Sequence, residues 1–305
     1  MSEREKMSTV TKKQNFKKYN RREATMGILF AAPWLIGFIA LMAFPLFYSL
    51  YLSCTNATTT SLFVEWRGLQ NYKIIMTDPE FWKSVGYTIQ YVVLSVPVNL
   101  VFALSLALLL NSKVKGRKAF RALYYIPTLV SIVSVVYLWK QLLGSAGVFN
   151  TILALFGAKG PDWFHDYQWA TVGLVIMSMW SVGGTIVIFL SSLTDVPVEL
   201  YEAVSVDGGN VFSKFFHVTI PAISPILFYN LLTTTIGAFQ VFVQPMLMTG
   251  GEYNTNYMGY YTYYTGFTVG RQGYASAMSW IMLAIIAVFV LVIQMARKKW
   301  AFYND

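Results

Sequence analysis

The charged residues best placed to do chemistry lie in one polar stretch, residues 202–221, which is set between two long apolar runs. The stretch carries two acids, Glu202 and Asp207, and Gly208 follows the second acid directly. Glycine turns the backbone where a bulkier residue would be strained. Acids beside such a turn favour contact with another protein over a reaction, because neither paired carboxylates near a pocket nor a nucleophile–base pair stands out in the sequence.

Local signals predict two short helices around this turn. We expect the first helix to begin just after Pro197, capped by the side chain of Thr194 or Asp195. The second should run from about Val211 to His217 and end before Pro221, which cannot continue a helix without losing a hydrogen bond. Two short helices with a glycine elbow form a projection that can dock into a groove.

Neutral hydrogen-bonding side chains inside two apolar runs are a second set of candidates. Residues 178–185 contain serines, glycines and a threonine, and residues 233–245 contain threonines and two glutamines. Such residues also let helices pack closely in lipid, which is the plainer reason for many of them. Gln240 and Gln244 are four residues apart and so should share one helix face. An amide that faced lipid would make no hydrogen bonds, which costs roughly 2–7 kcal/mol of free energy. We therefore expect both glutamines to face protein or a water-filled cavity.

The sequence lacks the groups that most reactions require. It contains no G-x-x-x-x-G-K-[ST] loop for nucleotide phosphates, and no Asp, Glu, Arg or His lies inside an apolar run to relay an ion. The single Cys54 excludes an internal disulfide and a cysteine-based metal cluster. His165 lies near Asp162 and Asp166, but loop residues of this kind are usually just solvated. We therefore expect no metal site, no catalysis, and an energy source on a partner.

Composition predicts a membrane protein. The 305 residues are 56% hydrophobic and 12% charged, which is too apolar for an ordinary soluble domain. A spanning helix needs about 20 apolar residues, and the runs lack the two-residue alternation of a membrane β-strand. We therefore predict an all-α polytopic membrane protein with six spans: Met26–Cys54, Val85–Leu110, Leu123–Leu142, Ala170–Leu193, Ala222–Met248 and Tyr274–Ala296.

The net charge of +9 predicts the orientation of the chain. Eight basic residues precede the first span, five lie in residues 113–121, and three more occupy residues 297–299. Because cytoplasmic segments carry the excess of Lys and Arg, both termini and the polar stretch should be cytoplasmic, and nucleic acid is not needed to explain the charge. The expected organisation is a mobile basic N-terminus, 1–25, that touches lipid head groups, a six-helix domain, 26–296, and a tail, 297–305.

The polar stretch resembles the EAA loop of the membrane subunits of bacterial ABC importers. That loop has Glu-Ala-Ala, Asp-Gly, an aromatic residue, Ile/Val-x-Leu and a proline. Val204 here replaces the second alanine, and Ile220 replaces the leucine. The segment 237–251 and the approach to the last span are also similar to this family. The likeness covers residues 25–300 and is closest to the carbohydrate-type permeases, the maltose "F"-like and glycerol-phosphate "A"-like subunits. The positions in register are Glu202, Ala203, Asp207, Gly208, Phe215, Val218 and Pro221.

This resemblance implies a type I ABC importer fold whose coupling loop, about residues 194–221, sits on an ATPase. It implies assembly with a second homologous permease subunit, two ATPase subunits and an extracytoplasmic solute-binding protein in a bacterial cell membrane. ATP and Mg would be bound by the ATPases, so this chain would hold no cofactor. The implied coupling residues are Glu202, Ala203, Asp207, Gly208, Phe215 and Pro221. The implied substrate contacts are Ser178, Trp180, Ser181, Val182, Thr185, Phe239, Gln240, Phe242 and Gln244.

A carbohydrate is the expected substrate, because sugars are bound by amide and hydroxyl groups together with aromatic rings. Three alternatives stay open at this point. The chain could serve an ABC importer for another solute such as a glycerol phosphodiester, it could be an ion-driven secondary transporter, or it could be a membrane scaffold that transports nothing.

Overall fold

The computed structural model describes residues 21–61, 63–112, 120, 123–124 and 126–297. The predicted mobile N-terminus up to residue 20, the basic cluster between the second and third spans, and the tail from residue 298 lie outside the described residues. The chain divides into two units, residues 1–51 and 52–305.

The first unit contains the first predicted span. Helices α1 (Arg21–Phe38) and α2 (Phe44–Ser53) are joined by a π-helical turn, η1 (Ile39–Ala43). Together they give a continuous apolar helix, Thr25–Ser53, as the sequence predicts. Pro45 lies two residues after the π-turn, and a π-turn is where a helix can absorb a missing backbone hydrogen bond.

The second unit is also helical, with a single antiparallel bridge between Thr55 and Trp66 in its described residues. Its longer helices are α4 (Pro79–Asn111), α6 (Ile132–Leu142), α8 (Ala170–Ser178), α9 (Gly183–Thr194), α10 (Val198–Val206), α12 (Ile220–Phe239) and α15 (Gln272–Arg297). Its short elements are α3 (Gln70–Thr77), η2 (Ile126–Leu129), α7 (Val148–Leu155), η3 (Met179–Ser181), α11 (Val211–Lys214), η4 (Phe215–Thr219), α13 (Val243–Met248), α14 (Met258–Tyr263) and η5 (Tyr264–Thr268).

Four helices of the described chain are long and apolar enough to cross a membrane: Thr25–Ser53, Pro79–Asn111, Val211–Phe239 and Gln272–Ala296. The pair Ala170–Ser181 and Gly183–Thr194, bent by 53°, makes a fifth if it is one span. The predicted third span is not a continuous helix here. After the 3-10 turn η2, which contains Pro127, a new helix of only 11 residues begins at Ile132. The fifth span also differs, because its helix begins at Val211 and ends at Phe239.

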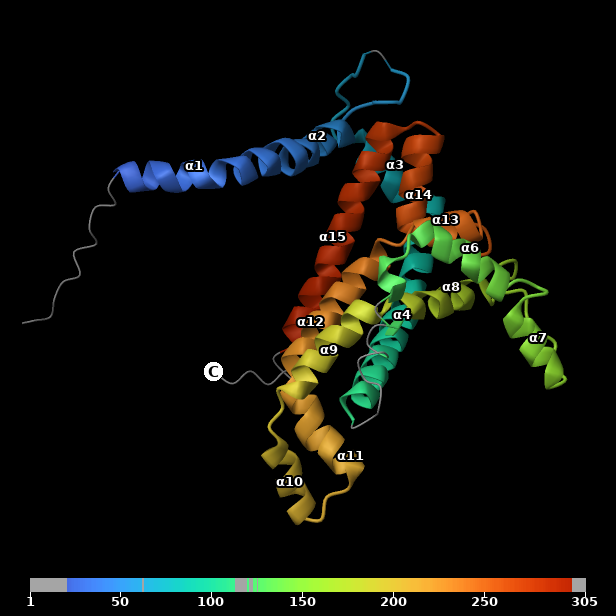
Figure 1. Ribbon diagram of the computed structural model, residues 1–305. Helices are drawn as coiled ribbons and strands as arrows, with labels where there is room; N and C mark the ends of the chain where they lie inside the picture. The colour runs from blue at the N-terminus through green and yellow to red at the C-terminus, as the bar shows by residue number, and fades with distance from the viewer. Residues whose placement is uncertain (1–20, 62, 113–119, 121–122, 125, 298–305) are drawn as a thin grey trace, which may run out of the picture. The chain divides into compact units, whose positions relative to one another are not determined.

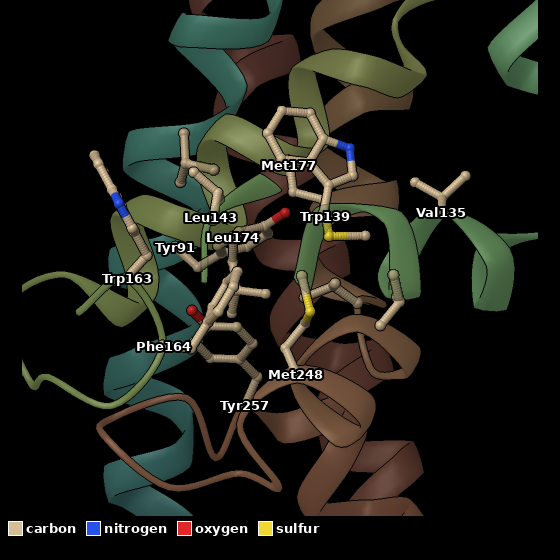
Figure 2. Packing of buried hydrophobic residues seen from close by; sticks show 13 residues of the cluster. Tyr91, Val135, Trp139, Leu143, Trp163, Phe164, Leu174, Met177, Met248 and Tyr257 are labelled. Carbon is tan, nitrogen blue, oxygen red and sulfur yellow. The ribbon is translucent and has the colours of Figure 1, made fainter. Parts of the chain in front are cut away.

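Helix α4 is the centre of the second unit, since α8, α9, α12 and α14 all pack against it. Figure 1 shows α9 and α12 beside it, with α10 and α11 projecting beyond their ends. On the side of α6 and α8, a core of buried aromatic and aliphatic side chains fills the space between helices (Figure 2). The rings of Tyr91 and Tyr257 lie 5.1 Å apart there, and the Tyr257 hydroxyl donates to Thr171 Oγ1 at 3.2 Å. This packing fixes one wall of the cavity described below.

Asp78 connects the beginnings of three helices. It caps α4, because its Oδ1 accepts from the backbone N–H of Glu80 at 3.0 Å. Its Oδ2 accepts from the hydroxyls of Tyr261 in α14, at 3.1 Å, and Tyr274 in α15, at 2.6 Å. Burial alone would raise the pKa of Asp78, but the hydrogen bonds from Tyr274, Glu80 and Tyr261 together hold that pKa below its usual value.

Replacing Asp78 should weaken this junction in a pH-dependent way. Asp78→Ala removes the cap of α4 and should lower the free energy of unfolding by about 1 kcal/mol. Because the folded pKa is lowered, the ionised carboxylate stabilises the fold above the unfolded pKa of about 3.9, and this contribution is lost as the pH falls through the folded value. Thermal unfolding of the purified protein between pH 7 and pH 3 measures both effects.

Asp78→Asn is the matched control, since asparagine caps helices as well as aspartate does but carries no charge. It should keep the cap and lose the acid-dependent part of the stability. Equal acid sensitivity in the wild type and in Asp78→Asn would contradict this account of the junction.

Candidate functional site

The second unit contains a cavity of about 600 Å³ between α4, α9 and α12. Every described residue that lines it is uncharged. Many of them carry hydroxyl or amide groups, and Tyr91 and Phe242 add aromatic rings. The lining residues are Tyr91, Ser95, Asn99, Ile132, Ser178, Ser181, Val182, Thr185, Thr233, Thr234, Gly237, Ala238, Gln240, Val241, Phe242, Val243 and Gln244. A space of this size, with converging hydrogen-bonding groups, has the dimensions of a small-ligand site.

A bend between α8 and α9 brings the first group of predicted residues to the cavity. The two helices meet at Val182 at an angle of 53°, with the 3-10 turn η3 before it. Gly183 stands at the bend because a Cβ there would overlap the backbone oxygen of Tyr124. The bend turns Ser178, Ser181, Val182 and Thr185 to the cavity.

A break between helices α12 and α13 brings the second group of predicted residues, Gln240, Phe242 and Gln244, to the cavity. Helix α12 ends at Phe239, Gln240 caps it in a non-helical conformation, and α13 begins at Val243. The prediction that Gln240 and Gln244 share one helix face is therefore wrong, because the break separates them. Gly259 at the start of α14 packs against the backbone oxygen of Val241, and this tertiary contact accompanies the break. Both glutamines nevertheless line the cavity, as expected from the cost of exposing an amide to lipid.

Helix α4 supplies a third face that our reading of the sequence missed. Tyr91, Ser95 and Asn99 lie four residues apart and line the cavity together. Asn99 exchanges hydrogen bonds with Ser178: its Nδ2 donates to Ser178 Oγ at 3.0 Å, and its Oδ1 lies 3.2 Å from the same hydroxyl. The signal was present in the sequence as three polar residues at helical spacing in an apolar run.

Two predicted contact residues lie elsewhere. Phe239 is fully buried and packs its ring against Phe289, with centroids 4.9 Å apart. Trp180 packs against Trp139 at 6.1 Å and lines a separate apolar cavity of about 480 Å³. Neither side chain lines the 600 Å³ cavity.

The predicted elbow is present as two helices, α10 and α11, joined by a tight turn. Helix α10 begins right after Pro197, as predicted, but Pro197 itself is the N-cap and no side chain caps the helix, so the predicted cap by Thr194 or Asp195 is wrong. Gly208 has φ of +78°, which confirms the need for glycine there. Asn210 caps α11 by accepting from the backbone N–H of Ser213 at 2.9 Å.

The second helix of the elbow does not end before Pro221. It continues through the π-turn η4 into α12, so that one helix runs from Val211 to Phe239. Pro221 lies in the first turn of α12, just after the π-turn, where a missing N–H is tolerated. The elbow is braced on this helix, since Tyr201 and Thr219 share a hydrogen bond of 3.1 Å between their hydroxyls, and Phe215 packs into the cluster beneath.

The tip of the elbow exposes both acidic and apolar side chains. Glu202, Ala203 and Asp207 are exposed. Beside them, Val206, Val211 and Phe212 leave 87%, 79% and 73% of their surfaces open. Exposed apolar side chains close in the sequence to exposed acids are typical of a protein-binding surface.

His165, the loop histidine near two acids, pairs with one of them. His165 Nδ1 lies 3.0 Å from Asp162 Oδ1, and both side chains are largely exposed. Burial would raise the pKa of Asp162, but the hydrogen bonds from the His165 ring and from two backbone N–H groups lower it. Within the described parts of the chain, no three His, Cys, Asp or Glu side chains gather to hold a metal ion.

Comparison with other proteins gives relatives along the whole chain, although no protein-family profile matches it. A probable ABC transporter permease protein, YesP of Bacillus subtilis, is 35% identical over 294 residues, which cover 93% of this chain and 94% of the relative. The multiple sugar-binding transport system permease protein MsmF of Streptococcus mutans is 32% identical, with 84% and 89% covered. The trehalose/maltose permease protein MalF of Thermococcus litoralis is 29% identical, with 90% and 94% covered.

The fold is shared with a solved chain of a bacterial ABC transporter involved in the import of the acidic polysaccharide alginate. The two chains superpose with a TM-score of 0.79, covering 92% of this chain and 96% of that one, at 22% identity. The helical arrangement is therefore that of an ABC importer's membrane subunit.

The bend beside the cavity can be tested with neighbouring glycines. Gly183→Ala should destabilise the protein by about 1–3 kcal/mol, since its Cβ would overlap the Tyr124 backbone. Gly184→Ala is the matched control, because a Cβ there meets nothing within 4 Å. Thermal unfolding of both purified variants gives the comparison. Equal stability of the two would show that the close approach does not determine the bend.

Proposed function

The chain belongs to the permease subunits of ABC transporters, and we propose that it forms half of the translocation path of a sugar importer. Several relatives are named for sugars, among them trehalose and maltose, arabinooligosaccharides and lactose. The uncharged cavity of about 600 Å³, lined by amides, hydroxyls and two aromatic rings, is the observation that carries the proposal.

The chemistry of the lining favours a neutral, hydroxyl-rich substrate. Gln240, Gln244 and Asn99 each offer both a donor and an acceptor, which matches a sugar hydroxyl that does both. Phe242 and Tyr91 can cover the apolar face of a sugar ring. A glycerol phosphodiester would bring a negative charge to a lining without Lys or Arg, so that alternative has less support. An ion-driven mechanism has less support too, because no lining residue is a carboxylate or a histidine.

Energy would enter at the elbow. We propose that Glu202, Ala203, Asp207, Gly208, Phe215 and Pro221 form the coupling surface on an ATPase subunit. Helices α9 and α12 begin or end at the elbow and reach the cavity with Thr185 and Gln240. Movement of the elbow by an ATPase would therefore shift two walls of the cavity, which is a route for alternating its access between the two sides of the membrane.

The working assembly would contain two permease subunits, two ATPase subunits and an extracytoplasmic solute-binding protein. ATP and Mg would be held by the ATPases. Basic residues are concentrated before the first span, in residues 113–121 and in residues 297–299. Because the loops of a membrane protein that carry such an excess are cytoplasmic, this distribution favours a bacterial plasma membrane protein whose termini and elbow are cytoplasmic.

The coupling surface can be tested at Phe212, an exposed aromatic residue at the tip of the elbow beside it. Phe212→Ala should weaken binding of the ATPase subunits about 30-fold, because removing an aromatic anchor from an interface costs about 2 kcal/mol. Phe267→Ala is the control, since Phe267 is similarly exposed, at 71%, but lies in η5 far along the chain. Titration of purified ATPase onto the permease pair measures the affinity. Unchanged binding by Phe212→Ala would place the interface elsewhere.

The cavity can be tested by removing one amide. Gln240→Ala should raise the sugar concentration for half-maximal uptake by about fivefold to tenfold, which corresponds to one lost hydrogen bond of about 1–1.4 kcal/mol. Gln141→Ala is the control, because Gln141 is exposed on α6 and does not line the cavity. Uptake into proteoliposomes that contain the whole importer gives the measurement. A half-saturation that stays at the wild-type value would exclude Gln240 from the substrate path.

A further inference from the structure

Two arginines that are far apart in the sequence share one small pocket. Arg67, from the loop before α3, and Arg271, from the turn before α15, both line a cavity of about 190 Å³. The remaining lining is mostly polar. It consists of Thr55, Asn56, Ala57, Thr58, Gln70, Asn71, Ile74 and Tyr274. This volume lies below the range of about 300–1,000 Å³ that whole small ligands occupy, so the pocket is suited to a single charged group.

Backbone hydrogen bonds hold the two loops together. The N–H of Gly273 donates to the Ala57 oxygen at 2.9 Å, and the N–H of Thr59 donates to the Gly270 oxygen at 2.9 Å. The Asn71 side chain also donates to the backbone oxygens of Ser53 and Thr55, at 2.9 and 2.8 Å. The pocket is therefore a built feature of the fold, and the two arginines cannot separate without breaking these bonds.

The pocket has more positive than negative charge. Glu65 lies 3.7 Å from Arg67, but both side chains are about half exposed or more, so this pair contributes little. Arg271 stacks on the ring of Tyr274 at 4.3 Å, and no ion pair joins it to an acid in the described chain. Asp78 lies behind Tyr274 and is already occupied by two tyrosine hydroxyls. Two guanidinium groups held at one cavity repel each other, and an anion placed between them removes that repulsion.

The position of the pocket relative to the spans identifies the kind of anion. In the sequence, the span Thr25–Ser53 ends two residues before Thr55, the first pocket residue. The span that begins at Pro79 follows the pocket residue Ile74, and the span that begins at Gln272 follows Arg271 directly. The pocket residues thus lie in segments that adjoin span ends, and such segments are expected at the depth of lipid head groups. Phe63 and Trp66, in the same loop, are exposed as interfacial aromatic residues usually are.

We propose that this pocket binds the phosphate group of an anionic phospholipid. Arginine forms paired hydrogen bonds with phosphate oxygens, and the first turns of α3 and α15, which contribute Gln70, Asn71 and Tyr274, add the favourable ends of two helix dipoles. A bound head group would hold the first loop against the start of the last span. The site lies apart from the substrate cavity and does not depend on what that cavity carries.

The test uses the complete importer purified in detergent. Its thermal unfolding is titrated with dihexanoyl phosphatidylglycerol, dihexanoyl phosphatidylcholine or inorganic phosphate at constant ionic strength. We expect phosphatidylglycerol to raise the Tm and the zwitterionic lipid to do so far less. In the variant Arg67→Ala/Arg271→Ala, the apparent affinity for phosphatidylglycerol should fall by about tenfold or more, equivalent to about 1.4 kcal/mol. Lys73→Ala is the control, because Lys73 is an exposed cation on α3 outside the pocket, and it should retain the shift.

A shift with phosphatidylglycerol alone supports a lipid head group, and equal shifts with inorganic phosphate support the same site filled by free phosphate. If the alanine variant fails to fold, Arg67→Lys/Arg271→Lys keeps the charge and should still weaken binding, because lysine lacks the paired geometry. No shift with either anion, an unchanged shift in the arginine variants, or equal shifts with both lipids would overturn the proposal. Weaker docking of the solute-binding protein without any anion effect would overturn it too, and would indicate an acidic protein side chain instead.

Discussion

The unbroken helix from Val211 to Phe239 is the constraint on which the rest of the structure depends. Its 29 residues extend about 44 Å, from the tip of the elbow to the edge of the cavity. Packed helices transmit displacement because protein interiors have low compressibility. The π-turn before Pro221 lets this helix pass a proline that would otherwise stop it. The elbow and the edge of the cavity thus lie at the two ends of one continuous helix, and Tyr201 and Thr219 hold the first elbow helix to it.

The cavity exists because two spans lose regular helical structure at about the same place. One span bends at Val182, and the other stops at Gln240 and resumes at Val243. Non-helical backbone inside a membrane is tolerated only where protein or a water-filled cavity satisfies its polar groups. The same breaks therefore explain why the site is polar and why it is uncharged: amides and hydroxyls can be satisfied there at low cost, whereas an ionised group would need a partner. In the mechanism proposed above, the permease combines a neutral cavity for the solute with a surface that receives energy from an ATPase.

Much of this arrangement could be read from the sequence because it depends on local chemistry. The start of α10 after Pro197, the need for glycine at 208, and the inward position of Gln240 and Gln244 follow from rules that involve one residue and its neighbours. The errors have tertiary causes. The continuity past Pro221 depends on a π-turn, the break at Gln240 accompanies the packing of Gly259 on Val241, and the shortened third span follows the turn at Pro127. The roles of Trp180 and Phe239 also depended on which way each side chain points, and periodicity in a mostly apolar helix does not determine that.

The central claim is that nucleotide binding by partner ATPases, received at the elbow, changes the access to the cavity. The most direct measurement places the variant Gln240→Cys in a Cys54→Ser background and follows its labelling by a membrane-impermeant thiol reagent in proteoliposomes of the whole importer. The account predicts that labelling from one side of the membrane changes at least severalfold when a non-hydrolysable ATP analogue is added, and that Glu202→Lys removes this change. The account would be contradicted if the labelling rate were the same with and without the nucleotide, or if it still changed with the nucleotide in Glu202→Lys.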